Sequence, residues 1–166
     1  MDKRKKRILI GAIGVTCIAF VAFIVGIIFL MTTVFSDREP ITAQEFRTKM
    51  EQKGFEVQDI INDLEYPVNI EYALIANKDG KQIEFQQFTY KDNAIEFFTQ
   101  NKIIFTESRG SRYVENNSRF ANYARYTLRA NDLFSVVSRI ENTVIYLVVA
   151  DSDRDTVNDI LRELGY

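Results

Sequence analysis

The sequence predicts an α+β protein, in which an N-terminal transmembrane helix precedes one small domain with an antiparallel sheet packed by about three helices. Two observations support this fold class. Residues 8–35 form an apolar run without a charged side chain. In residues 42–166, hairpin signals alternate with three helix-start signals, and this order favours an antiparallel sheet with the helices on one face.

The apolar run 8–35 is long enough to span a membrane. As a helix it would extend about 42 Å, against a hydrocarbon core of about 30 Å. Five basic residues and one acidic residue precede it, so we expect the tail 1–7 in the cytoplasm and the rest of the chain outside. The alternative is a signal peptide cleaved after Ser36, but such a peptide has a shorter apolar core of about 7–15 residues.

We therefore expect a single-pass anchor in a cell membrane, a short linker at 36–41 and an extracytoplasmic domain at 42–166. The lipid bilayer is the expected partner of residues 8–35. Small residues recur on one side of this predicted helix, which would allow close packing against another transmembrane helix.

Composition excludes several classes of function. The chain has no histidine, which excludes Ser-His-Asp and Cys-His catalysis and zinc sites with histidine ligands. Cys17 is its only cysteine and lies in the predicted span, so the outer domain has no disulfide, and we favour a bacterial envelope protein. Residues 37–166 hold 16 basic and 22 acidic residues, a net charge of −6, which disfavours nucleic acid as a partner. We expect no cofactor.

The outer domain begins with a clear helix signal. Thr42 and Glu45 have the spacing of a capping box, and the helix is predicted over 43–53 with Phe46 and Met50 buried. Gly54 suits the position that ends a helix with a left-handed backbone.

A short strand is predicted over 55–58, and a hairpin follows. Ile70, Tyr72, Leu74 and Ala76 alternate on its first strand, residues 77–80 form the turn, and Ile83 and Phe85 resume the alternation. The opposite face is polar and is expected to meet water; it carries Glu71, Gln82, Glu84 and Gln86.

A second helix is predicted from Thr89, with Asp92 as its capping partner, to about Phe105. Its apolar residues recur at helical spacing and are expected to face the core: Ala94, Phe97, Phe98, Ile104 and Phe105. Residues 106–118 are polar and are predicted as a mobile loop, with a short strand near 112–115.

Three strands and a helix complete the domain. The strands are predicted over 120–129, 133–140 and 143–150, and the last of them is apolar on both faces, which places it centrally in the sheet. The final helix is predicted from Ser152, with Asp155 completing a capping box, to Gly165.

Asp151, Asp153 and Asp155 are candidate metal ligands, because carboxylates at alternate positions can converge on calcium. The sixth position of this motif is Thr156, where a calcium loop needs glycine, and the twelfth is Arg162, where it needs an acid. An acidic first turn is also what the helix dipole favours. We therefore prefer the capping interpretation to a metal site.

A cluster of basic residues is the candidate interaction site. The alternation places Arg119, Tyr123, Arg125 and Arg129 together on one strand face, and Arg139 on the next strand adds to them. Arginine beside tyrosine can hold phosphate, carboxylate or an acidic protein surface. The alternatives are a solvated sheet face and contact with anionic lipid headgroups.

No nucleophile-elbow, Ser-x-x-Lys or phosphate-loop motif occurs, so no catalytic residue is assigned. The sequence favours a membrane-anchored, extracytoplasmic interaction or ligand-binding module without enzymatic activity. The alternatives are an envelope enzyme that uses carboxylates or a metal ion, and a structural subunit of a membrane complex.

Overall fold

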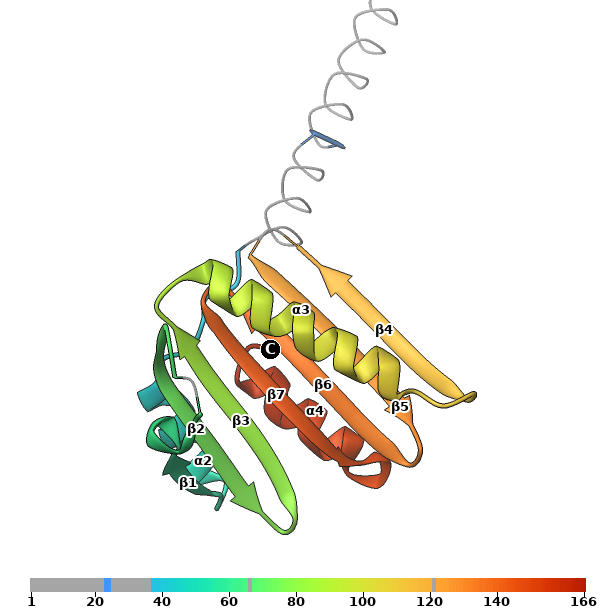
Figure 1. Cartoon of the computed structure of the whole chain (residues 1–166), viewed down its shortest axis with the longest axis horizontal. Coiled ribbons are helices and arrows are strands. Elements are labelled where there is room, and N and C mark those ends of the chain that lie inside the picture. Colours follow the sequence, from blue (N-terminus) through green and yellow to red (C-terminus); the bar gives the residue numbers. More distant parts are fainter. Residues whose placement is uncertain (1–22, 25–36, 66, 121) are drawn as a thin grey trace, which may run out of the picture. The chain divides into compact units, whose positions relative to one another are not determined.

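The computed structural model describes residues 23–24, 37–65, 67–120 and 122–166 (Figure 1). The predicted tail (1–7) and transmembrane helix (8–35) lie outside the described residues, apart from the helical pair Phe23 and Ile24. Of the helices that the structure describes, none is both long and apolar enough to cross a membrane. Residues 37–166 form one unit with its own hydrophobic core.

Within residues 37–166, seven strands form one antiparallel sheet with the order β1-β2-β3-β7-β6-β5-β4. The strands are β1 (Glu56–Asp59), β2 (Ile70–Lys78), β3 (Lys81–Phe88), β4 (Tyr113–Arg119), β5 (Tyr123–Ala130), β6 (Leu133–Ile140) and β7 (Thr143–Ala150). The helices are α2 (Ala43–Gln52), α3 (Lys91–Ser108) and α4 (Arg154–Glu163), with 3₁₀ turns at Ile61–Asp63 and Asp151–Asp153. The predicted antiparallel sheet with three helices is confirmed.

Two meanders meet in the middle of this sheet. The first runs through β1, β2 and β3, the second through β4, β5, β6 and β7, and β3 pairs with β7 where they join. The predicted central position of residues 143–150 is confirmed. Side chains of β7 are buried on both faces, as Val144 and Ile145 show.

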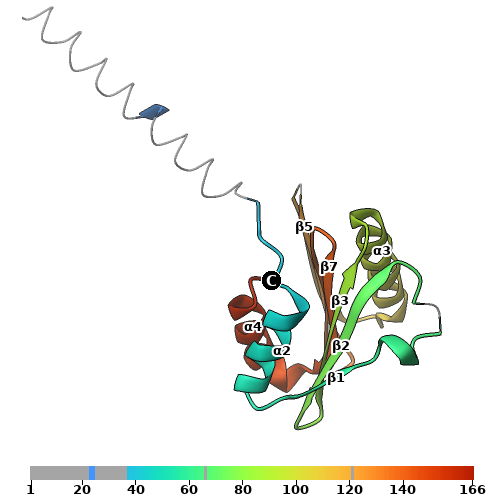
Figure 2. The same ribbon diagram turned by 90° about the vertical axis from the view of Figure 1, so that its left-hand side faces the viewer.

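The helices cover both faces of the sheet. Figure 2 shows α2 and α4 on one side and α3 on the other, so the expectation of helices on a single face is wrong. Each side has its own core: Phe46 and Leu161 are buried on the side of α2 and α4, and Phe98 and Phe105 on the side of α3. Strands that are apolar on both faces need a cover on each, and a one-sided arrangement would leave one core open to water.

The polar face of the β2–β3 hairpin, which is predicted to meet water, is consequently partly covered. Gln86 is only 6% exposed, and its Oε1 atom is buried without a hydrogen-bond partner among the described residues. Burial raises the pKa of Glu84 on the same strand. A β-bulge between Ile70 and Tyr72 also shifts the register of β2, so Ile70 packs on the α3 side rather than beside Leu74.

The first predicted helix cap is confirmed. The Thr42 hydroxyl oxygen accepts a bond from the Glu45 N–H (3.2 Å), and the Glu45 carboxylate accepts one from the Thr42 N–H (2.8 Å). This second bond holds the pKa of Glu45 below its usual value. Gly54 has φ +79°, as the predicted helix end requires.

The other two predicted caps are wrong. Helix α3 begins after Tyr90, which is its N-cap residue and makes no side-chain cap bond; Thr89 lies one residue before the N-cap, and its N–H donates to the carbonyl of Asn69. Helix α4 begins after a 3₁₀ turn, with Asp153 at its N-cap and no side-chain bond there.

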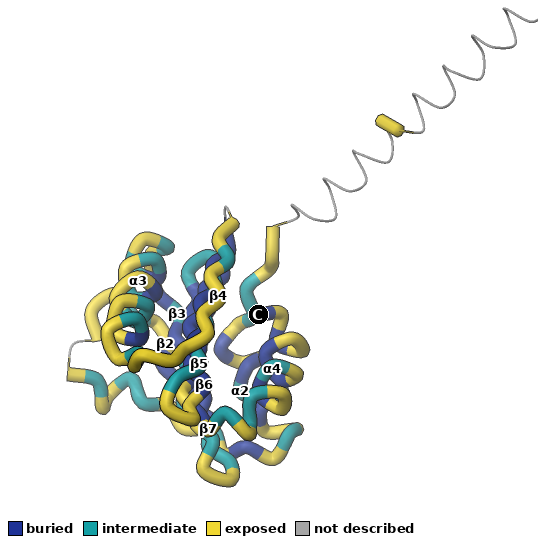
Figure 3. The backbone as a smooth tube through the Cα atoms, turned by 90° about the vertical axis from the view of Figure 1, so that its right-hand side faces the viewer, coloured by how far each residue is buried: buried dark blue, intermediate teal, exposed yellow. Residues whose placement is uncertain are grey.

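Most of the predicted loop 106–118 has regular structure. Helix α3 continues to Ser108, and β4 occupies 113–119. Ile104, which was expected in the core, is 57% exposed, because Phe98 and Phe105 define the buried side of α3. Figure 3 shows the burial along the chain, with β4 exposed at the edge of the sheet.

The cap at Thr42 gives the first prediction. Thr42→Ala removes the hydroxyl acceptor and leaves the Glu45 N–H unpaired, so the free energy of unfolding should fall by about 1 kcal/mol. Circular dichroism during urea unfolding of the full chain in mild detergent measures it. Thr42→Ser keeps the acceptor and is the matched control; an equal loss in that variant would contradict the capping explanation.

Candidate functional site

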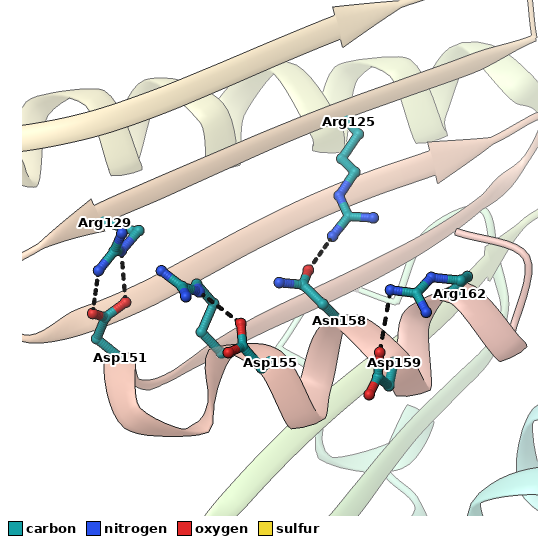
Figure 4. A network of polar contacts seen from close by, with 8 residues as sticks. Arg125, Arg129, Asp151, Asp155, Asn158, Asp159 and Arg162 are labelled. Atoms are coloured by element: carbon teal, nitrogen blue, oxygen red, sulfur yellow. Dashed lines mark hydrogen bonds and ion pairs between the residues drawn. The ribbon is translucent and has the colours of Figure 1, made fainter.

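Two of the predicted arginines lie on β5 and face α4. Arg125 Nη1 donates to the main-chain oxygen of Tyr166 (3.1 Å), and its Nη2 donates to Oδ1 of Asn158 (2.7 Å). Arg129 donates from Nε and Nη2 to the two carboxylate oxygens of Asp151, at 2.8 and 2.6 Å. Figure 4 shows both arginines reaching from the sheet to α4 and the turn before it.

These arginines line a hollow of about 330 Å³ between β4, β5 and α4, which we call the arginine pocket. Helix α4 contributes Arg154 and Asn158, which lie on one side because they are four residues apart. The complete lining is Asn116, Ser118, Arg125, Thr127, Arg129, Phe134, Arg154 and Asn158. Of the described residues that line the pocket, three are arginines and none is Asp or Glu.

The three guanidinium groups differ in how far they are neutralised. Arg129 forms a bidentate pair with Asp151, and the bonds from Arg129 hold the pKa of Asp151 below its usual value. Arg154 pairs with the exposed Asp155 through Nε (3.0 Å). Arg125 bonds an amide oxygen and a main-chain oxygen, and has no Asp or Glu partner among the described residues. The guanidinium groups of the pocket have the donor geometry to hold a carboxylate or phosphate.

The other predicted members of the arginine face are not available there. Arg119 and Arg139 each pair across the strands with Ala124, whose side chain belongs to the α3-side core. Directly opposite residues share a face, so these two arginines lie on the opposite side of the sheet from Arg125. The prediction of a single face is wrong for both.

Burial excludes two of the predicted residues from ligand contact. Arg139 is 3% exposed, donates to the carbonyl of Glu141 (2.9 Å), and has its pKa lowered by burial. Tyr123 does face the α4 side, but it is 4% exposed, and the Arg38 guanidinium lies 3.8 Å from its ring centre. Arg125 and Arg129 are the predicted interaction residues that line the pocket.

The three candidate metal ligands are each paired with a different cation. Asp151 binds Arg129, Asp153 lies 3.5 Å from Lys81 Nζ, and Asp155 binds Arg154. Within the described part of the chain, no group of three or more His, Cys, Asp or Glu side chains could hold a metal ion.

Sequence reasoning missed half of the pocket. Arg154 and Asn158 are detectable in principle from their four-residue spacing on a predicted helix, but Arg154 lies inside the acidic Asp151–Asp155 segment, whose pattern predicts a helix cap or a metal site instead. Asn116 and Ser118 fall in the segment predicted as a loop, so no periodicity assigned them to a face of the sheet.

No protein-family model, curated protein or solved structure matches this chain. The geometry of the site itself therefore carries the functional argument.

The Arg129–Asp151 pair predicts a dependence of stability on pH. Because the folded-state pKa of Asp151 is depressed, its stabilising contribution is present above the ordinary value of about 3.9 and is lost as the pH falls through the lower folded-state value. Asp151→Asn should therefore unfold more easily than the wild type at pH 7, with a difference that shrinks well below pH 4. Thermal unfolding of the full chain at both pH values measures this.

Asp155→Asn is the matched control, because Asp155 is largely exposed and binds only the neighbouring Arg154. A deficit of Asp151→Asn that is the same at both pH values would contradict the assignment to the ionised carboxylate.

Proposed function

We propose that this chain is a membrane-anchored, extracytoplasmic binding module without enzymatic activity, which takes an anionic group of a ligand or partner at the arginine pocket. The observation that carries the proposal is the lining of that pocket. Three guanidinium groups share it with four neutral polar side chains and Phe134, and no carboxylate lies among its described lining residues.

The electrostatics favour recognition at short range. Residues 37–166 have a net charge of −6, so the domain as a whole repels anions at long distance. The arginine pocket offers directed guanidinium donors. Arg125 is held by Asn158 and Tyr166, which limits the rotamer freedom that binding would otherwise remove. An anion would therefore be bound by direct hydrogen bonds rather than attracted from afar.

The same lining favours binding over catalysis. Its hydroxyl groups are those of Ser118 and Thr127, and a hydroxyl nucleophile needs an adjacent base to activate it. Arginine remains protonated at physiological pH and cannot serve as that base. The described lining thus supplies donors that orient an anion and lacks a group that would accept a proton from a nucleophile.

The membrane location in this proposal rests on the sequence. The uncharged run 8–35 fits a single bilayer span, and the five basic residues before it favour a cytoplasmic N-terminus. With this orientation the arginine pocket would face the extracytoplasmic space.

The location is testable with protease. In intact cells or spheroplasts that express the full chain with an epitope after Tyr166, added protease should destroy the epitope without permeabilisation, because the domain is outside. A cytoplasmic protein co-expressed in the same cells should stay intact. Loss of the epitope only after permeabilisation would contradict the proposed orientation.

Anion binding is testable at Arg125. Titration of the full chain in mild detergent with inorganic phosphate and with succinate, followed by thermal unfolding, should raise the melting temperature. Arg125→Gln should weaken the binding about tenfold to a hundredfold, because a hydrogen bond to a charged group contributes about 1.5–3 kcal/mol.

Arg162→Gln is the matched control. Arg162 lies on the same helix as Arg154, pairs with Asp159 and is outside the pocket lining, so its loss should leave anion binding unchanged. The proposal fails if neither anion shifts the melting temperature, or if both variants bind like the wild type.

A further inference from the structure

Strand β4 is a long, open edge of the sheet. It pairs with β5 on one side, and among the described strands none lies on its other side. Its seven residues run without a register shift, and six of them are exposed (Figure 3). The opposite edge, β1, has only four residues. Natural edge strands are commonly protected by Pro, charged side chains, a bulge or short length; β4 carries the charged residues Glu115 and Arg119 but has no Pro and no bulge and is not short.

The register identifies which backbone groups of β4 are unpaired. The Phe120 N–H donates to the carbonyl of Tyr123 (2.7 Å), so this pair closes the β4–β5 hairpin. Hydrogen-bonded and non-bonded pairs alternate in an antiparallel ladder. Val114, Asn116 and Ser118 therefore direct their backbone groups toward β5. The residues between them direct their N–H and C=O groups toward the open edge; they are Tyr113, Glu115, Asn117 and Arg119.

This open edge borders the arginine pocket. Asn116 and Ser118 pair with Thr127 and Arg125, so their side chains lie on the α4 side and form part of the pocket wall. Both side chains are small, which leaves the guanidinium groups of β5 within reach of a strand added beside β4.

A second hollow, of about 500 Å³, continues the groove along the same strand. It is lined by Arg112, which precedes β4, by Val114, and by Arg129, which it shares with the arginine pocket. Asp132 and Asp151 also line it. A ligand that follows β4 would therefore meet guanidinium groups at both hollows, and it would meet carboxylates only at the second.

We propose that β4 binds an extended acidic peptide as an additional antiparallel strand, with alternate Asp or Glu side chains directed into the arginine pocket. This inference rests on the proposed function and names the class of partner. Backbone hydrogen bonds to the open edge would supply affinity, and the pocket would select acidic side chains opposite Val114, Asn116 and Ser118.

A second copy of the chain fits this edge less well. Two β4 strands could pair in antiparallel fashion about Asn116. Val114, Asn116 and Ser118 of one copy would then lie opposite Ser118, Asn116 and Val114 of the other, all on the α4 side of the sheet. None of these is acidic, and Glu115 would lie on the opposite face. Two arginine pockets would also be brought side by side. Charge complementarity therefore favours an acidic peptide.

The test uses an acetylated, amidated and fluorescently labelled heptapeptide in which four Thr alternate with three Glu. Paired with β4, its Glu side chains lie opposite Val114, Asn116 and Ser118, and its Thr residues direct their N–H groups to the open edge. The matched probe is the same peptide N-methylated at the Thr residues, which keeps the charge and removes the edge donors. Fluorescence anisotropy with the full chain in mild detergent should give at least about tenfold weaker binding of the methylated peptide.

The protein variant for the same test is Asn117→Pro, with Asn117→Ala as its control. Proline removes an N–H that faces the open edge and spares the bonds between β4 and β5. Asn117→Pro should lose peptide affinity at least about tenfold and still bind inorganic phosphate, which shows that the domain is folded and the pocket intact. Asn117→Ala should bind the peptide like the wild type.

The outcomes separate this inference from the proposed function. Equal affinity of both peptides, or phosphate binding without peptide binding, overturns strand addition and leaves the arginine pocket as an anion site. Absence of both phosphate and peptide binding overturns both proposals. A dimer of the free chain that Asn117→Pro dissociates, together with no peptide binding, assigns the edge to a second copy and overturns the acidic partner.

Discussion

The pairing of β3 with β7 is the constraint on which the rest of the domain depends. It joins two meanders whose strands are far apart in the sequence, as in the pairs Ile83 with Leu147 and Phe85 with Ile145. This junction places β7 at the centre of the sheet and leaves β1 and β4 as its edges. Because the central strands are apolar on both faces, each face needs a helical cover, and α3 supplies the one that α2 and α4 cannot. The strand order also fixes the position of the arginine pocket, because β5 and β4, which form its wall, are the last two strands at one edge of the sheet.

The polar residues of the pocket show how one part of this architecture orients another. Arg129 and Asp151 connect β5 to the turn before α4, and Arg125 connects the same strand to Asn158 within the helix. These bonds fix two guanidinium groups in the free domain, which reduces the entropy that an incoming anion must remove. The bonds also distinguish the three arginines: Arg129 binds a carboxylate through two bonds, Arg154 binds one through a single bond, and Arg125 bonds Asn158 and the main chain of Tyr166.

Local signals in the sequence predicted the elements well and their assembly less well. Residues 133–140 and 143–150 coincide with β6 and β7, and the Thr42–Glu45 cap has the bonds that its spacing implies.

The alternation of side chains shows which residues share a face within one strand, but it does not continue from one strand to the next through a turn. Arg119 lies on β4 and Tyr123 on β5, so their spacing could not place them together, and Arg139 was separated from Arg125 for the same reason. Periodicity also identifies buried residues without saying which helix covers them, hence the error about the faces of the sheet. The cap expected at Ser152 failed because the chain makes a 3₁₀ turn there, where Arg129 binds Asp151.

In the binding mode that we propose, an acidic domain with an arginine pocket at an open sheet edge would combine two kinds of recognition that compensate for each other. Surface charge pairs alone are screened by salt and contribute little, and here the net charge of −6 opposes the approach of any anion. Backbone hydrogen bonds along β4 carry no net charge and are insensitive to that repulsion, but by themselves they would accept almost any extended chain. Where the edge and the pocket adjoin, the edge can supply the affinity that charge cannot, and the guanidinium groups can supply the selectivity that a backbone ladder lacks. Neither β1, which is short, nor Arg139, which is buried, offers this combination, which is why we place the proposed binding site at the junction of β4, β5 and α4.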